Sequence, residues 1–202
     1  MTVKTIAISN LHKIADRELI ASSLAGREDG FEELVRRYQR PITAYVYRMT
    51  SDYDAALDVT QEIFIKVYNS LARYKTEYKF STWLYKIARN AAIDYLRRNN
   101  HGDVQLEIEM GDDETFERPL ESHAPTPEQE RERSEWRAEL QSVVQKLPTA
   151  YRDLILLRHS QDLSYDEIAE ITNLPLGTVK NRLFRAREIM RDLLVERGIT
   201  GV

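Results

Sequence analysis

The sequence predicts an all-α protein made of two small helical domains. It has 202 residues, of which 42% are hydrophobic and 31% are charged, so a charge-rich chain still has the apolar material for packed cores. Glycine (7 residues) and proline (6 residues) are scarce, which favours long helices over the short strands and tight turns of a sandwich or barrel. This length suits one large domain or two small ones.

The distribution of charge divides the chain into parts. The net charge is −4, but residues 1–100 carry 16 Lys and Arg against 12 Asp and Glu, residues 101–135 carry 3 against 12, and residues 136–202 carry 10 against 9. Low hydrophobicity combined with a high net charge is typical of a disordered linker. We therefore expect an N-terminal arm at 1–15, a helical domain at 16–100, an acidic flexible linker at 101–130 and a second helical domain at 131–202.

The composition excludes several classes of protein. Because the chain has no cysteine, it has no disulfide framework, no thiolate nucleophile and no cysteine-ligated metal. The four histidines are far apart, and none has the spacing of a zinc hydrolase. The glycine motifs that bind nucleotide phosphates are missing, and no apolar run reaches the ~18–20 residues of a membrane span. We expect a cytoplasmic protein without cofactor or metal.

The first domain contains four candidate helices. Along each of them, apolar residues recur at intervals of three and four, as on a helix with one buried face. Asp29 is a candidate N-cap for the second helix, and Pro41 inside that helix predicts a kink or a break into two. The expected spans are Asp16 to Ala25, Phe31 to Met49, Tyr53 to about Tyr74 and Ser81 to Arg98. In the third, Ala56, Leu57, Thr60, Ile63, Phe64, Val67, Tyr68 and Leu71 are expected to face inward, and Asp58, Gln61, Glu62 and Lys66 outward.

Cationic and aromatic residues alternate from Arg73 to Arg98. Cations can follow a phosphate backbone and aromatic faces can stack on unpaired bases, so this segment has the residue types of a surface that binds single-stranded nucleic acid. A solvated basic face over an aromatic core explains the same composition, and a tryptophan such as Trp83 is more often a core residue than a platform for a base. The cations are Arg73, Lys75, Lys79, Lys86, Arg89, Arg97 and Arg98, and the aromatic residues are Tyr74, Tyr78, Phe80, Trp83 and Tyr85.

The second domain contains the pattern of a helix-turn-helix. Ser164, followed three residues later by Glu167, is a capping box that fixes the start of a short helix. Residues 173–177 are expected to form the turn, and a helix rich in Lys and Arg begins near Gly177, as in proteins that place this second helix in the major groove of DNA. Two further helices are expected before the motif, from Trp136 to Leu147 and from Tyr151 to Arg158.

The basic helix carries side chains suited to DNA. Between Thr178 and Arg191 five residues are basic and only Glu188 is acidic. This local excess matters more than the whole-chain charge, because salt screens charges that lie more than ~8–10 Å away. A basic helix end can also compensate the helix dipole. The candidate base contacts are Thr178, Lys180, Asn181, Phe184 and Arg185, and the candidate phosphate contacts are Arg182 and Arg187.

The chain contains four motifs in this order: Asp58 to Tyr68, Phe80 to Asn90, Leu163 to Glu170 and Leu176 to Arg187. Together they resemble the extracytoplasmic-function (ECF) sigma factors, a group of the sigma-70 family of bacterial RNA polymerase. The resemblance covers roughly residues 15–98 and 130–195. It implies a sigma region 2 bundle, a region 4 helix-turn-helix, and a protein that is not an enzyme but directs core polymerase to promoters, melts the minus-ten element and initiates transcription, in response to stress and under anti-sigma control.

The resemblance also implies partners and sites. The partners are the polymerase core, through its beta-prime clamp and beta flap, promoter DNA and an anti-sigma factor. The polar face of the third helix would bind polymerase through Asp58, Gln61, Glu62 and Lys66. The basic and aromatic segment would bind the minus-ten element through Lys79, Phe80, Trp83, Lys86, Arg89 and Asn90. The helix-turn-helix would read the minus-35 element, with Lys180, Asn181, Phe184 and Arg185 at the base-contacting positions.

Three hypotheses remain beside this interpretation. The acidic segment 101–135 is expected to imitate a nucleic-acid strand in the polymerase channel and to screen the basic faces of the free protein. An activator that works beside polymerase would share the helix-turn-helix but would leave the Asp58 and Phe80 motifs unexplained. A helical enzyme using a carboxylate or His159 has little support, because no nucleophile, base and orienting group can be placed together.

Overall fold

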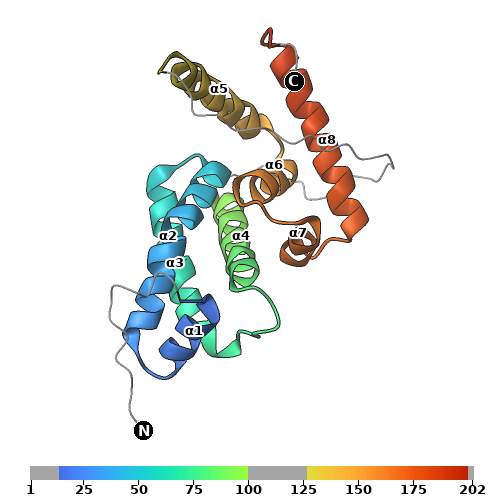
Figure 1. The fold of residues 1–202 in the computed structure, drawn as a ribbon. Helices are drawn as coiled ribbons and strands as arrows, with labels where there is room; N and C mark the ends of the chain where they lie inside the picture. Colours follow the sequence, from blue (N-terminus) through green and yellow to red (C-terminus); the bar gives the residue numbers. More distant parts are fainter. Residues whose placement is uncertain (1–13, 100–126, 200–202) are drawn as a thin grey trace. The chain divides into compact units, whose positions relative to one another are not determined.

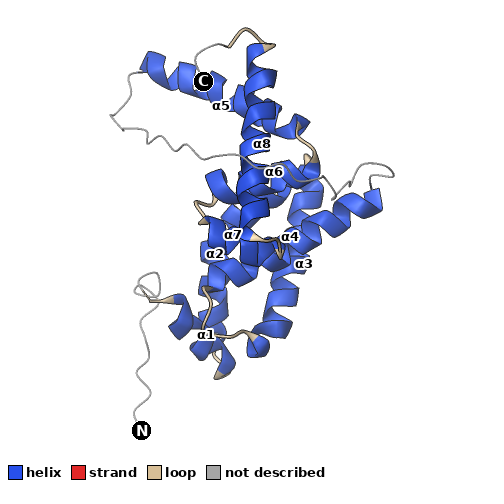
Figure 2. Ribbon diagram, turned by 90° about the vertical axis from the view of Figure 1, so that its right-hand side faces the viewer, coloured by secondary structure: helices blue, strands red, loops and turns tan. Residues whose placement is uncertain are grey.

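The computed structural model describes residues 14–99 and 127–199, which belong to two compact units, residues 1–95 and 96–202 (Figure 1). Every regular element in the described residues is helical, as Figure 2 shows, so the predicted all-α class is confirmed. The expected N-terminal arm, apart from residues 14–15, and the acidic segment up to residue 126 lie outside the described residues. In the described part, no helix combines the length and apolarity needed to cross a membrane.

The first unit contains the four expected helices, of which the fourth extends past residue 95. They are α1 (Asp16–Leu24), α2 (Glu28–Thr50), α3 (Tyr53–Ser70) and α4 (Phe80–Asn99), with the short 3-10 turn η2 (Leu71–Arg73) after α3. Gly26, which follows α1, has a φ of 81°, a left-handed conformation that suits glycine. The N-cap of α3 is Asp52, whose Oδ1 accepts a hydrogen bond of 3.0 Å from the Ala55 N–H.

One expectation about α2, its N-cap, is wrong. The helix begins at Glu28, so Asp29 is not its cap; the Asp29 carboxylate accepts a hydrogen bond of 3.2 Å from the Ser22 hydroxyl of α1 instead. At Pro41, of the two expected outcomes, the break does not occur, because α2 runs through this residue as one helix; the kink stays a prediction. Proline in a helix interior costs about 3 kcal/mol, and residues buried on both sides of it, such as Leu34 and Tyr45, offset this cost.

The core of the first unit lies between α2, α3 and α4. Tyr45 of α2 is fully buried, and its ring packs edge to face on Tyr85 of α4 with centroids 5.7 Å apart. Two residues expected to face inward on α3 do not: Leu57 is 37% exposed and Tyr68 is 58% exposed. Both lie at the edge of the apolar stripe, where the spacing of three and four residues does not decide burial. The other buried residues of α2 to α4 include Leu34, Ile42, Val46, Ile63, Val67, Leu84 and Ala88.

The second unit contains a helix-turn-helix preceded by two helices. The elements are α5 (Pro127–Lys146), α6 (Thr149–Ile155), the π-helical turn η3 (Leu156–Ser160), α7 (Tyr165–Thr172) and α8 (Leu176–Val195). Because α5 begins at Pro127, with proline at a first helical position that it suits, residues 127–130 of the expected linker are helical. Arg152 of α6 donates to the carbonyl oxygens of Gln145 (2.6 Å) and Leu147 (3.0 Å). These bonds give hydrogen-bond partners to carbonyl groups at the C-terminal end of α5.

Candidate functional site

The outer face of α3 combines charged and apolar side chains. Asp58, Gln61, Glu62 and Lys66 are all exposed, as the sequence predicts. The sequence interpretation missed Ile65, which is 61% exposed and lies at the centre of this face by the helical period. A single exposed apolar residue is ordinary, but Ile65 shares this face with the exposed Leu57 and Tyr68, and such a group of apolar side chains indicates a contact surface. We call Leu57, Asp58, Gln61, Glu62, Ile65, Lys66 and Tyr68 the α3 outer face.

The position of α3 is fixed from both ends of the unit. The Tyr95 hydroxyl of α4 donates to Asp52 Oδ2 at 3.2 Å, so the residue that caps α3 is also bonded to α4. Tyr68, near the other end of α3, packs edge to face on Phe31 of α2 with centroids 4.9 Å apart. These contacts connect both ends of α3 to neighbouring helices of the unit.

The basic and aromatic segment contains an aromatic cluster that is partly core. The Phe80 ring is 3% exposed and packs on Tyr38 at 5.5 Å and on Tyr74 at 5.7 Å between centroids. A base cannot stack on a ring that is covered on this scale, so the structure does not place Phe80 as a DNA contact. Trp83 is half-buried, with its centroid 5.3 Å from Tyr74 and 5.8 Å from Phe80.

The remaining minus-ten candidates lie around this cluster. Lys79 and Asn90 are exposed, while Lys86 and Arg89 are half-buried. The loop before α4 also presents Tyr78, which is 49% exposed and was not among the candidates. The Tyr74 hydroxyl donates to the Tyr78 carbonyl oxygen at 2.5 Å, so the aromatic cluster also fixes this loop.

The helix-turn-helix forms as the sequence predicts. The Ser164 hydroxyl accepts from the Glu167 N–H at 3.2 Å, and the Glu167 carboxylate accepts from the Ser164 N–H at 2.8 Å, which completes the capping box of α7. Asn173 ends α7 in a left-handed conformation, with a φ of 56°, and α8 begins at Leu176. Asparagine tolerates this conformation better than most residues, so the tight turn can form here.

The buried face of α8 determines which side chains face outward. Val179 and Leu183 are buried, with 0% and 1% exposure, and they pack α8 within the unit. The helical period then turns the candidate base contacts away from the core. Lys180 and Arg185 are exposed, whereas Thr178, Asn181, Arg182, Phe184 and Arg187 are half-buried.

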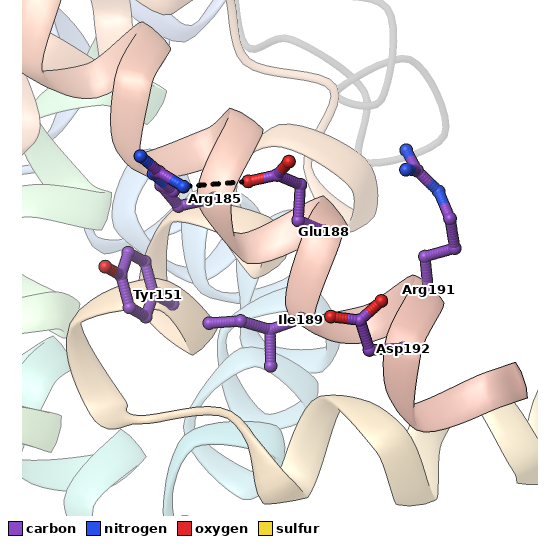
Figure 3. A pocket seen from close by; sticks show the side chains of 6 residues that line it. All are labelled: Tyr151, Arg185, Glu188, Ile189, Arg191 and Asp192. Atoms are coloured by element: carbon purple, nitrogen blue, oxygen red, sulfur yellow. Dashed lines mark hydrogen bonds and ion pairs between the residues drawn. The ribbon is translucent and has the colours of Figure 1, made fainter. Parts of the chain in front are cut away.

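An open pocket of about 470 Å³ continues the outer side of α8 (Figure 3). Its lining comes from Tyr151 of α6 and from Arg185, Glu188, Ile189, Arg191 and Asp192 of α8. Arg185 Nη1 and Glu188 Oε2 form an ion pair of 3.2 Å at its rim. The pocket is polar and shallow, and His159 is not part of its lining, so it gives no support to an enzyme that uses this histidine.

Two family models match the chain, one in each unit. Sigma-70 region 2 matches residues 34–102, and Sigma-70 region 4 matches residues 137–190. Among curated proteins, the chain is 35% identical over 184 residues to the RNA polymerase sigma-H factor of Pseudomonas aeruginosa, covering 89% of this chain and 93% of that protein. It is 37% identical over 171 residues to the ECF RNA polymerase sigma factor SigW of Bacillus subtilis, covering 84% and 91%.

Solved structures share the fold. CnrH, in complex with the cytosolic domain of CnrY, has a TM-score of 0.66 and 24% identity, covering 91% of this chain and 99% of that chain. The sigma factor RpoE from Bartonella quintana, in complex with the anti-sigma factor NepR, has a TM-score of 0.60 and 21% identity, covering 82% and 96%. At these identities the likeness concerns the fold alone.

Proposed function

The chain belongs to the ECF sigma factors of the sigma-70 family, and from this membership we propose which of its surfaces bind polymerase and which read promoter DNA. A protein of this family directs transcription initiation and has no catalytic activity of its own. Membership therefore excludes the helical enzyme, and it accounts for the region 2 motifs that an activator would leave unexplained.

The α3 outer face is the proposed polymerase-binding surface. Asp58 and Glu62 supply negative charge, Lys66 supplies a cation, and Ile65 supplies apolar area that becomes buried on binding. Interfaces of this composition, with an apolar centre and a charged rim, gain affinity from the centre and orientation from the rim. The partner surface is the clamp of the beta-prime subunit.

The segment around the aromatic cluster is the proposed minus-ten surface. Lys79, Lys86 and Arg89 would follow the phosphates of one strand, and Trp83 and Asn90 would meet its bases. Tyr78 joins them because nearly half of its side chain is exposed. Phe80 is left out, because its buried ring holds Tyr74 and Trp83 in place.

Helix α8 is the proposed reader of the minus-35 element. Lys180, Asn181 and Arg185 offer hydrogen bonds to base edges in the major groove, with Thr178 and Phe184 beside them. Arg182 and Arg187 lie on the flanks of this face and suit phosphates. The observation that carries the proposal is the complete burial of Val179 and Leu183, because it orients all these residues away from the core.

Membership of the family extends the proposal to the location of the protein and to its regulation. We place the protein in the cytoplasm, where core polymerase and promoter DNA are found, with contacts to the beta flap as well as the clamp. An anti-sigma factor would cover the polymerase-binding surfaces until a signal arrives. The sigma factor RpoE of Bartonella quintana, whose fold the chain shares, was solved in complex with the anti-sigma factor NepR and is a precedent for this proposal.

A selection experiment tests the assignment of surfaces. The chain is reconstituted with core polymerase, and promoters are selected from a library randomised in two blocks at variable spacing. We expect two enriched blocks, and Arg185→Gln should change only the upstream block while Trp83→Ala changes only the downstream one. Lys146→Gln, an exposed change on α5, serves as the control. Enrichment of a single block, or variants that alter the opposite block, would refute the assignment.

A further inference from the structure

The first residue of α1 is attached to α2 through both oxygens of its carboxylate. Asp16 Oδ1 accepts from Arg37 Nη1 at 2.8 Å, and Asp16 Oδ2 accepts from the Tyr38 hydroxyl at 2.5 Å. The Asp16 side chain is 25% exposed, so these charge-assisted bonds form where water competes with them less than at a fully exposed site. The sequence interpretation gave Asp16 and Tyr38 no functional role.

Tyr38 connects this attachment to the aromatic cluster of the proposed minus-ten surface. Its ring packs edge to face on Phe80, with centroids 5.5 Å apart. The Phe80 ring packs in turn on Trp83 at 5.8 Å and on Tyr74 at 5.7 Å, and Tyr74 lies 5.3 Å from Trp83. Two rings in contact therefore join a carboxylate of α1 to Trp83, the residue proposed to meet a base.

The electrostatics of two tyrosines agree with this arrangement. Burial raises the pKa of Tyr38, and the hydrogen bond to Asp16 raises it further. Burial also raises the pKa of Tyr74, and the charge of Asp16 adds to this effect while Arg17 opposes it. The Asp16 carboxylate therefore acts on both tyrosines, and both hydroxyls stay protonated and able to donate hydrogen bonds.

We propose that Asp16 and Tyr38 are positioning residues, which hold Trp83 in the orientation that stacks on a base of the minus-ten strand. A base gains stacking energy only from an aromatic face that is presented to it, and a face ordered before binding loses less entropy when the strand arrives. The Tyr38 hydroxyl fixes the ring against which Phe80 packs, and Phe80 supports Trp83. This inference rests on the proposed minus-ten surface.

Binding of two DNA probes by the holoenzyme tests the proposal. One probe is a single strand that carries the selected downstream block, and the other is a duplex that carries only the upstream block. Tyr38→Phe keeps the ring but removes the hydroxyl that donates to Asp16, so it should weaken binding of the single strand about fivefold and leave duplex binding unchanged. Tyr47→Phe is the matched control, because it removes a hydroxyl from another half-buried tyrosine of α2 and should change neither.

A double variant shows whether the two residues act through one bond. Asp16→Ala should also weaken binding of the single strand, and the addition of Tyr38→Phe should cause no further loss, because the bond between them is already absent. The proposal is overturned if the two losses multiply in the double variant, or if Tyr38→Phe alone binds the single strand like the wild type.

The fluorescence of Trp83 gives a readout of position that is separate from stability. The chain has two tryptophans, so Trp136→Phe leaves Trp83 as the single one. In that background, at a temperature where the chain is folded, Tyr38→Phe should increase quenching of Trp83 by acrylamide, whereas Tyr47→Phe should not. Unchanged quenching would overturn the proposal. If Trp83→Ala binds the single strand like the wild type, the proposed minus-ten surface fails, and the quenching still decides whether Tyr38 holds Trp83 in place.

Discussion

Gly30, near the start of α2, packs against the backbone of α1. A Cβ added there would be 2.4 Å from the Leu19 carbonyl oxygen and 2.9 Å from Ser22 Cβ, and the first of these neighbours is backbone. Since backbone cannot move aside cheaply, only glycine fits at this crossing.

The corresponding prediction is that Gly30→Ala lowers the free energy of unfolding by about 1–3 kcal/mol, the usual cost of overpacking a tight contact. Gly177→Ala is the matched control, because no atom lies within 4 Å of its added Cβ and the position is helical, so it should be neutral or slightly stabilising. Urea unfolding measures both. Equal effects would show that α1 does not pack as closely as the structure has it.

Glu33 is the acceptor at the centre of a polar cluster that joins α1 to α2. Its side chain is 6% exposed, and it accepts from Arg36 at 2.6 and 2.7 Å and from Arg37 at 2.9 Å. Arg37 also pairs with Asp16 of α1 at 2.8 Å. The hydrogen bonds from Arg36 and then Arg37 outweigh desolvation and lower the pKa of Glu33 from 4.5 to about 2.

The sign of the resulting pH effect follows from this shift. A carboxylate whose pKa is lower in the folded state stabilises the fold above its unfolded pKa of 4.5, and this contribution is lost as the pH falls from 4.5 towards about 2. Glu33→Gln should therefore be less stable than the wild type at neutral pH. It should also lose less stability than the wild type as the pH falls from 4.5 towards about 2. Glu32→Gln, an exposed neighbour, should follow the wild type. If Glu33→Gln has the same dependence of stability on pH as the wild type, the bonds from Arg36 and Arg37 to Glu33 do not stabilise the fold.

At the residue level, much of the α8 surface was predictable, whereas Phe80 was not interpreted correctly. Phe80, Leu84 and Ala88 are spaced by four residues and share one buried face of α4. That spacing in the sequence predicts a buried Phe80. The alternation of cations and aromatic residues in the same segment instead favours a contact with nucleic acid, and the structure shows that the spacing decides the burial of this ring. Ile65 was missed for the opposite reason, because an apolar residue on a polar face has no periodic partner.

At the scale of elements, the outer face of α3 can be tested as a single surface. Ile65→Ser should weaken binding to core polymerase about tenfold, the effect of removing an apolar anchor from an interface, with little change in thermal stability because the side chain is exposed. Leu24→Ser is the matched control: it makes a similar change at a side chain of α1 that is 55% exposed. Loss of affinity in both variants, or in neither, would remove α3 as the binding surface.

Helix α8 gives a second test at this scale. Arg185→Gln should reduce discrimination against the wrong base at one position of the upstream block by about 1–3 kcal/mol, because a bidentate arginine contact specifies a base. Arg182→Gln should weaken binding to all sequences alike, because a phosphate contact carries no sequence information. Binding to a panel of single-base variants of the block measures both. A uniform loss for Arg185→Gln would assign it to the backbone instead.

The boundaries of elements were less predictable than their existence. The capping box gave the start of α7 correctly, since two specific side-chain hydrogen bonds fix it. The start of α2 has no such side-chain cap, and Arg27 precedes it without a capping bond. Where no side-chain hydrogen bond caps a helix, tertiary packing determines the residue at which the helix begins or ends. The pattern of a single sequence does not reveal that packing, so such boundaries are hard to predict.

At the scale of the whole molecule, the net charge of −4 conceals how the chain is organised. The two described units belong to regions 2 and 4 of the family, and the strongly acidic stretch falls between them in the sequence. The order of the units, the helix-turn-helix and the family were all predictable from motifs, because capping, spacing and charge are local properties. The hypothesis that the acidic segment screens DNA binding concerns residues outside the described ranges and stays a prediction.

Promoter-dependent initiation with purified components tests the central claim most directly. The chain is added to core polymerase on a template that carries both selected blocks, and transcripts are measured beside templates with either block scrambled. We predict a stable complex with core and a defined transcript that requires the added chain and depends on both blocks. Failure of the chain to bind core polymerase, or transcription that is indifferent to both blocks, would contradict the account.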